Sequence, residues 1–112
     1  RIPLAEAVVY LATSPKSNSA YLGINHALEI VRQTGNQPVP LHLRNAPTKL
    51  MKDLGYSDGY KYSHDYPNHF APQQYMPDAL KDTRIWQPQH TPIEERQYQH
   101  MLQCWGDKYR NQ

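Results

Sequence analysis

The sequence predicts an all-α domain: a helical hairpin, then a Pro- and Tyr-rich, mostly irregular segment, then a last helix. Three observations support this. Two apolar runs at helical spacing lie within residues 1–32, prolines and tyrosines crowd the chain after residue 38, and a capped amphipathic run lies near the C-terminus. We expect one domain spanning residues 1–112, and a hydrophobic fraction of 38% allows it only a lean core.

The first helix is predicted to begin near Pro3, because proline fits the first helical position, where its missing N–H costs nothing. Leu4, Val8 and Leu11 fall on one face, and neighbouring alanines and valines widen this face. The helix should end before Pro15, since the residue before a proline is pushed out of the helical region.

The second helix is predicted to follow a cap at Ser17 or Asn18 and to end at Gly35. A short link makes two helices antiparallel neighbours, and a tight crossing between them would explain Gly23 inside the second one. We therefore expect the large residues of both helices to form the core and part of a subunit interface. They are Leu4, Val8, Tyr10, Leu11, Tyr21, Ile24 and Leu28.

The second half offers shorter elements. Thr48 is expected to cap a short helix that Gly55 closes, and Thr91 with Glu94 has the capping-box spacing of a last helix that ends at Gly106. Between them, the rings of residues 56–75 should pack on the helices in irregular structure. Short strands at residues 60–62 and 84–86 are alternatives that the alternation of side chains allows.

No catalytic, cofactor-binding or metal site is predicted. The five glycines form no nucleotide-binding spacing. Cys104 with a histidine would make a nucleophile pair, but a lone thiol on an apolar helix is usually structural. His100 and Cys104, with His64 and Asp65, are an alternative metal set that lacks a second close pair of ligands.

Basic and aromatic residues alternate in one region, where they would suit contact with DNA or a partner protein. Such residues hold single strands by charge and stacking. The competing interpretation, which the sequence favours, places the tyrosines in the core and the lysines on a solvated rim. The residues concerned are Lys49, Lys52, Tyr60, Lys61 and Tyr62.

The net charge and hydropathy of the chain exclude few classes of function. The net charge of +2 demands neither nucleic acid nor membrane as a partner, and no apolar stretch is long enough to cross a bilayer. A single cysteine rules out an internal disulfide. The chain begins at Arg1, within a helical pattern, so we interpret it as a fragment of a longer protein.

Four stretches resemble one known family. They are RIPLAEAVVYLATSPKSNSAYLGINHAL, PVPLHLRNAP, GYKYSHDYP and QQYMPDAL, in that order, and they cover the chain to about Leu80. Together they resemble the C-terminal domain of the RarA/MgsA family of AAA+ ATPases, which has the Werner helicase-interacting protein as a eukaryotic relative. The tail beyond Leu80 resembles the family more loosely.

The resemblance implies an all-α domain that is related to the collar domains of clamp loaders. It also implies that the domain assembles as a homotetramer and has no membrane partner. It implies that ATP and Mg²⁺ bind only to an ATPase core outside this chain, and that the parent protein acts on DNA in replication-associated recombination and stalled-fork maintenance. From the resemblance we expect a bacterial protein of the cytoplasm that is associated with the nucleoid. We also expect replication proteins as candidate partners. The hypothesis is a non-catalytic oligomerisation domain; the alternative is a DNA- or replication-partner-binding module using the Tyr/Lys-rich segment.

Overall fold

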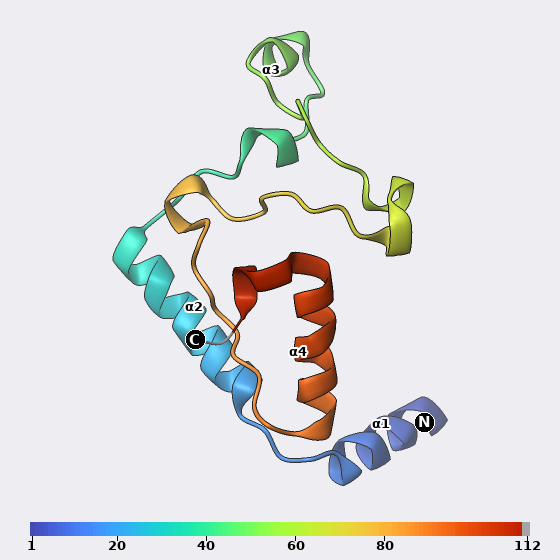
Figure 1. Cartoon of the computed structure of the whole chain (residues 1–112). Coiled ribbons are helices and arrows are strands. Elements are labelled where there is room, and N and C mark those ends of the chain that lie inside the picture. Colours follow the sequence, from blue (N-terminus) through green and yellow to red (C-terminus); the bar gives the residue numbers. More distant parts are fainter. Residues whose placement is uncertain (111–112) are drawn as a thin grey trace.

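The computed structural model describes residues 1–110 and confirms the all-α class (Figure 1). The α-helices are α1 (Ile2–Thr13), α2 (Ser19–Thr34), α3 (Lys49–Asp53) and α4 (Pro92–Trp105). Short 3-10 turns join them: η1 (Leu41–Leu43), η2 (Ser63–Asp65), η3 (Pro67–His69), η4 (Asp78–Leu80) and η5 (Gly106–Tyr109). Neither alternative strand forms within residues 1–110: residues 60–62 and 84–86 are irregular.

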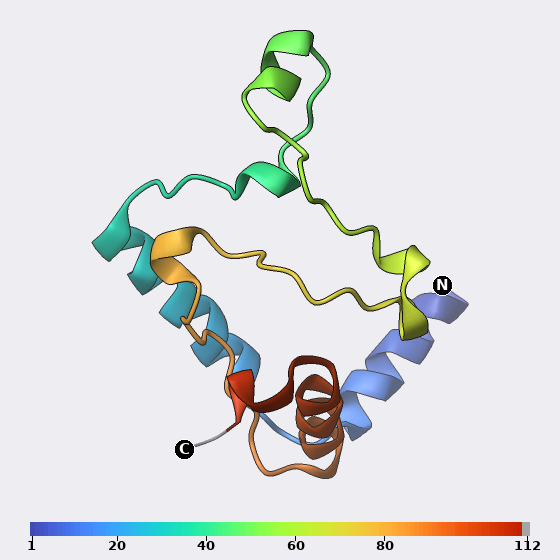
Figure 2. The same ribbon diagram turned by 45° about the horizontal axis from the view of Figure 1, so that its top comes forward.

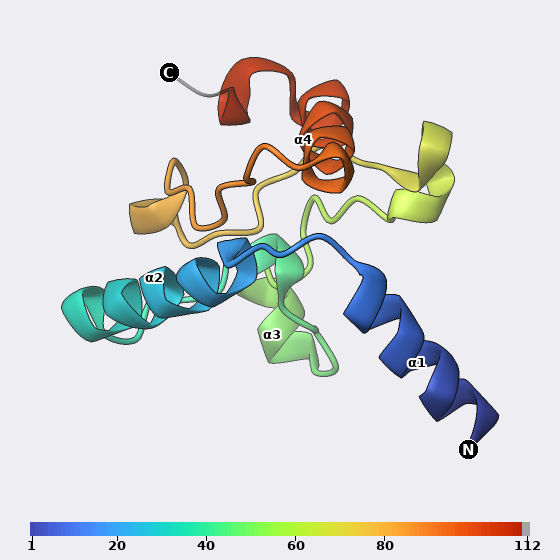
Figure 3. The ribbon, with the colours of Figure 1, turned by 90° about the horizontal axis from the view of Figure 1, so that it is seen from below.

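The predicted hairpin packing is wrong. The three views show α1 and α2 diverging from their link instead of lying side by side (Figures 1, 2 and 3). Ser14 is extended, with φ −74° and ψ 147°, and Pro15 follows it, so the link carries α2 away from α1. Across the described residues, no two α-helices pack lengthwise against each other.

The chain is open for its size. Its radius of gyration is 18.1 Å, whereas about 13 Å is usual for a compact domain of this length. Its accessible surface is 9108 Å², against the roughly 6,400 Å² of a compact monomer of the same mass. Of the residues that the structure describes, only Ser19, Gly23, Ala71 and Glu94 are buried. The chain therefore lacks a sizeable core of its own.

Helix α2 turns a face of mainly small residues inward and exposes most of its large ones. Ser19 and Gly23 are buried, and Ala27, Ile30 and Thr34 continue the same face half-buried. This face lies against the extended segment 84–88: a Cβ on Gly23 would lie 3.6 Å from Trp86 Cδ1, and His26 Nδ1 lies 3.3 Å from the Ile85 carbonyl oxygen. Gly23 thus accommodates an extended segment, not a crossing helix.

A polar junction at Glu94 joins α2 to α4. The Glu94 carboxylate accepts hydrogen bonds from Ser17 Oγ (2.9 Å), from Ser19 Oγ and from the Gln89 amide (3.1 Å). Trp86 Nε1 donates to Ser19 Oγ at 3.0 Å, which ties the extended segment into the same junction. The hydrogen bond from Ser19 is the main cause that holds the pKa of Glu94 below its ordinary value, and burial opposes it.

An aromatic cluster fixes the other end of α4. Trp105 meets Phe70, Tyr75 and Tyr109 edge-on, at ring-centroid distances of 5.0, 6.3 and 5.8 Å. Edge-to-face pairs of this kind stabilise by about 0.5–1.5 kcal/mol each beyond the area they bury. The prediction that the rings of residues 56–75 pack on the helices is confirmed for Phe70 and Tyr75. Together with the Glu94 junction, this cluster holds α4 in place.

Candidate functional site

Helix α1 is an apolar helix without a partner in the described chain. Every residue from 1 to 13 is exposed, and the large side chains include Ile2, Val9 and Tyr10. Its side-chain hydrogen bonds stay local, such as Thr13 Oγ1 donating to the Val9 carbonyl at 2.8 Å. Helices of about 12 residues are marginal in water without tertiary packing, and helices apolar over most of their circumference are normally buried. Helix α1 therefore needs a surface from elsewhere.

The exposed face of α2 is apolar as well, and it includes Leu22 and Val31. The residues predicted as core or subunit interface are 47–71% exposed in this chain. They are Leu4, Val8, Tyr10, Leu11, Tyr21, Ile24 and Leu28. As a core of the chain the prediction is wrong, because α2 turns its small residues inward and α1 meets nothing. As a subunit interface it stays a prediction. We call these residues, on both helices, the apolar faces.

The predicted DNA or partner contact lies on a projection. Residues 44–60 stand out from the rest of the chain around α3, and we call this the α3 projection (Figures 1 and 2). Lys49 and Lys52 are exposed on α3, while Tyr60 and Tyr62 are 52% and 54% exposed at its base. The favoured interpretation of these two tyrosines as core is therefore wrong.

Two sets of hydrogen bonds fix the projection. Arg44 donates from Nη1 to the Tyr56 hydroxyl at 3.0 Å, with its guanidinium carbon 5.0 Å from the centre of that ring. At the base, the Gln73 side chain forms two hydrogen bonds with the Lys61 backbone. Gln73 Oε1 accepts from the Lys61 amide at 3.2 Å, and Gln73 Nε2 donates to the Lys61 carbonyl at 2.8 Å. Lys61 Nζ donates to the Pro72 carbonyl at 3.1 Å, so its ammonium is already engaged. Lys49 and Lys52 are the freer cations of the predicted set.

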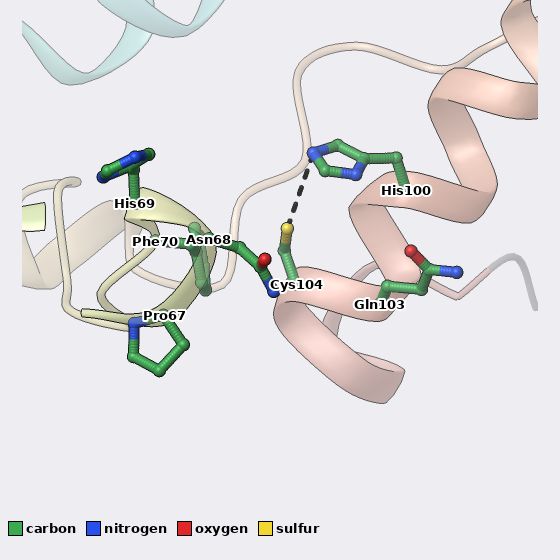
Figure 4. Close-up of a pocket in the computed structure, with 7 residues that line it drawn as sticks. All are labelled: Pro67, Asn68, His69, Phe70, His100, Gln103 and Cys104. Carbon is green, nitrogen blue, oxygen red and sulfur yellow. Dashed lines mark hydrogen bonds between the residues drawn. The ribbon is translucent and has the colours of Figure 1, made fainter. Parts of the chain in front are cut away.

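The pocket beside η3 holds the predicted Cys104–His100 pair (Figure 4). Cys104 Sγ lies 3.7 Å from His100 Nε2 on the same side of α4, and Asn68 points toward Cys104. The lining residues, which include His69, enclose about 520 Å³. Asn68 and His69 both have positive φ, at 57° and 54°. Within residues 1–110 no group of three or more His, Cys, Asp or Glu side chains is placed to hold a metal ion. The alternative metal set is therefore not assembled.

Sequence reasoning missed two polar features. The first is an incomplete capping box at Thr91. Thr91 Oγ1 accepts from the Glu94 amide at 3.2 Å, but the Glu94 carboxylate does not return to the Thr91 amide. It accepts instead from Ser19 and Ser17, which are 75 and 77 residues away in the sequence. The second feature is Arg84, whose Nε and Nη2 are buried without a hydrogen-bond partner among residues 1–110. Local patterns could reveal the cap but not the distant serines.

No helix in the described part is long and apolar enough to cross a membrane.

Comparison with known proteins identifies the family. The family model described as the C-terminal region of the MgsA AAA+ ATPase matches residues 1–105. The chain belongs to this family of C-terminal domains of AAA+ ATPases. The predicted resemblance is thereby confirmed, and the match extends through α4.

Two bacterial relatives show the likeness in detail. The chain is similar to replication-associated recombination protein A of Haemophilus influenzae, with 45% identity over 92 residues, and to that of Bacillus subtilis, with 47% over 91 residues. Each comparison covers 81% of this chain and 21% or 22% of the relative. ATPase WRNIP1 of Dictyostelium discoideum is 39% identical over 85 residues, or 75% of this chain and 10% of the relative. The chain thus spans about a fifth of the length of the bacterial relatives.

Proposed function

We propose that this chain is a non-catalytic oligomerisation domain that assembles AAA+ ATPase subunits into a homotetramer. The observation that supports it is the apolar faces, exposed on α1 and α2 with no cover from the rest of the described chain. Exposed apolar surface beyond scattered single residues marks protein contact sites. The clamp-loader-like relationship belongs to the same proposal.

The size of the exposed surface fits an obligate assembly. The chain exposes about 2,700 Å² more than a compact monomer of its mass would. Obligate subunit interfaces bury roughly 2,000–5,000 Å² and resemble a domain core cut in two. A closed, symmetric oligomer would cover the faces of every copy equally, which an open chain of contacts would not.

The function of the whole protein forms part of the same proposal. We propose that ATP and Mg²⁺ bind to an ATPase core outside this chain and that the complete protein contacts DNA. The complete protein acts in replication-associated recombination and stalled-fork maintenance, in the bacterial cytoplasm at the nucleoid. The support is the family to which the chain belongs and the names of its bacterial relatives. Under this proposal the domain organises subunits, and catalysis occurs elsewhere.

Thermal unfolding at different concentrations tests the assembly. Unfolding of an oligomer releases separate chains, so its Tm rises with chain concentration, whereas the Tm of a monomer does not. We expect a rise in Tm over a roughly hundredfold range of concentration. A Tm that stays constant over that range, with reversible unfolding at each concentration, would contradict assembly through this domain.

The second candidate function is a DNA- or replication-partner-binding module at the α3 projection. The observation that favours it is the joint exposure of Lys49 and Lys52 with Tyr60 and Tyr62. Phosphate contacts release counterions, so affinity for single-stranded DNA should fall steeply with salt, and Lys49→Ala with Lys52→Ala should reduce the slope by about 2. Absence of binding at low salt, measured by fluorescence anisotropy, would remove this function for the domain.

A further inference from the structure

A second pocket lies where the segment 82–90 meets the turn after α4. It encloses about 700 Å³, and its lining includes Asp82, Arg84, His90, Lys108 and Arg110. Figure 1 shows the C-terminal turn η5 beside this segment, on the side of α4 that faces α2. The pocket is separate from the α3 projection and from the apolar faces. Its lining holds three cations, Arg84, Lys108 and Arg110, and one acidic residue, Asp82.

Arg84 is the unusual member of this pocket. Its Nε and Nη2 atoms have almost no accessible surface and no hydrogen-bond partner, and the ion pairs of the described residues do not include it. Buried charged donors are normally paired, because leaving them unpaired costs the full price of desolvation. Nε and Nη2 lie on the same edge of a guanidinium, which is the edge that grips an oxyanion with two parallel hydrogen bonds. The unpaired atoms are therefore a matched pair of donors.

The other charges of the pocket leave a positive excess. Arg110 Nη2 pairs with Asp107 Oδ1 at 2.7 Å, so this cation is compensated. Lys108 Nζ instead lies over the rings of Trp105 and Tyr109, at 5.0 and 5.4 Å from their centres. Aromatic faces hold a cation in position without neutralising it. Asp82 is the acidic residue of the lining, and its single negative charge is outnumbered by the two positive charges of Arg84 and Lys108.

We propose that this pocket binds a phosphate group, with the fork of Arg84 gripping two of its oxygens and Lys108 approaching a third. A phosphate carries more charge than a carboxylate and has three strong acceptor oxygens. This suits Arg84 and Lys108, two cations of different geometry that form no ion pair among the described residues. Arg84 lines the 700 Å³ space, while its Nε and Nη2 edge is covered. Binding therefore requires the guanidinium to rotate so that this edge faces the space, where its two unpaired donors gain partners. The phosphate is free, or belongs to a nucleotide or a nucleic-acid backbone.

Titration of the 112-residue chain with inorganic phosphate, followed by NMR, tests the site. Sodium chloride at equal ionic strength serves as the reference. We expect saturable shifts of the Arg84 Nε–H and Trp105 indole signals. Arg84→Lys, which keeps the charge but loses the fork, should weaken binding about tenfold, and Lys108→Ala should weaken it several-fold. Arg96→Ala, which removes an exposed arginine of α4 outside this pocket, should bind as the original chain does. No saturation, or equal affinity in all three variants, would overturn the proposal.

Further probes identify the source of the phosphate. A mononucleotide and a single-stranded oligonucleotide are titrated beside inorganic phosphate, each against Arg84→Lys. Tighter binding of one of them that depends on Arg84 supports the site and names its source. A Glu-rich peptide that binds through Arg84 while phosphate does not would overturn the proposal and make the pocket a protein contact. Because Lys49 and Lys52 lie outside it, Lys49→Ala with Lys52→Ala should leave phosphate affinity unchanged.

Discussion

Leu11→Asp is expected to convert the assembled chain into monomers while its helices stay folded. Leu11 is 71% exposed in the single chain, so a charge there meets water and costs the monomer little. In an assembly, the substitution removes about 2 kcal/mol of apolar burial per copy and places a carboxylate in an apolar contact. Since each 1.4 kcal/mol is tenfold in affinity, we expect assembly to weaken at least roughly 100-fold.

Gel filtration and circular dichroism of paired variants check this expectation. Leu50→Asp is the matched control, because Leu50 is 67% exposed but belongs to α3 on the projection. The control should elute as the original chain does, and both variants should keep its helical signal. If Leu11→Asp keeps both the assembly and the helical content, Leu11 lies outside the interface. If both variants dissociate, the effect belongs to added charge and not to the apolar faces.

Glu94→Ala is expected to lower the free energy of unfolding by about 2–3 kcal/mol. The substitution leaves Ser17, Ser19 and the Gln89 amide without their shared acceptor. Buried donors left unpaired cost about 1–3 kcal/mol each, partly offset where water reaches them. Because this junction connects α2, the extended segment and α4, its loss should loosen all three together.

Denaturant unfolding at one fixed chain concentration measures the effect. Glu95→Ala is the control: it removes the same charge from the same turn, but Glu95 is exposed, and its carboxylate accepts from Gln99 Nε2 of the same helix at 2.9 Å. We expect the control to change stability by less than about 0.5 kcal/mol. Equal losses in both variants would mean that the junction contributes no more than an ordinary surface carboxylate.

The junction also gives stability a pH dependence of defined sign. The hydrogen bonds lower the pKa of Glu94 in the folded state, so its stabilisation is fully present above the pKa of the unfolded chain. It is lost as pH falls through the lower, folded value. Glu94→Gln should therefore remove part of the acid sensitivity of unfolding, while Glu95→Gln should not. An unchanged acid profile in Glu94→Gln would contradict this role.

Local chemistry predicted the helices well. Pro3 lies in the first turn of α1, Thr48 caps α3 by accepting from the Met51 amide at 3.2 Å, and Gly106 follows Trp105 at the end of α4. These signals act over a few residues, so sequence alone contains them. The second cap shows the limit: Asn18 is the N-cap of α2, yet its side chain accepts from Gln89 Nε2 instead of capping the helix.

Packing between elements was predicted poorly, for a physical reason. The rule that joined helices pack together assumes that a chain buries its own apolar faces. Here α2 covers its small face with segment 84–88 and leaves Tyr21, Ile24 and Leu28 open. The candidate interface could be selected from apolar periodicity, but whether it meets the same chain or another copy depends on contacts that no local pattern encodes. The pairing of Ser19 with Glu94 is hidden for the same reason.

The mass of the chain in solution tests the central claim most directly. Light scattering after gel filtration, over a range of loading concentrations, should give four times the 13.1 kDa of the chain. That result would support assembly by this domain, and the Leu11→Asp variant then tests whether the apolar faces form the contact. A mass of 13.1 kDa at every concentration would contradict assembly by this domain. It would leave the α3 projection as the better candidate for its function.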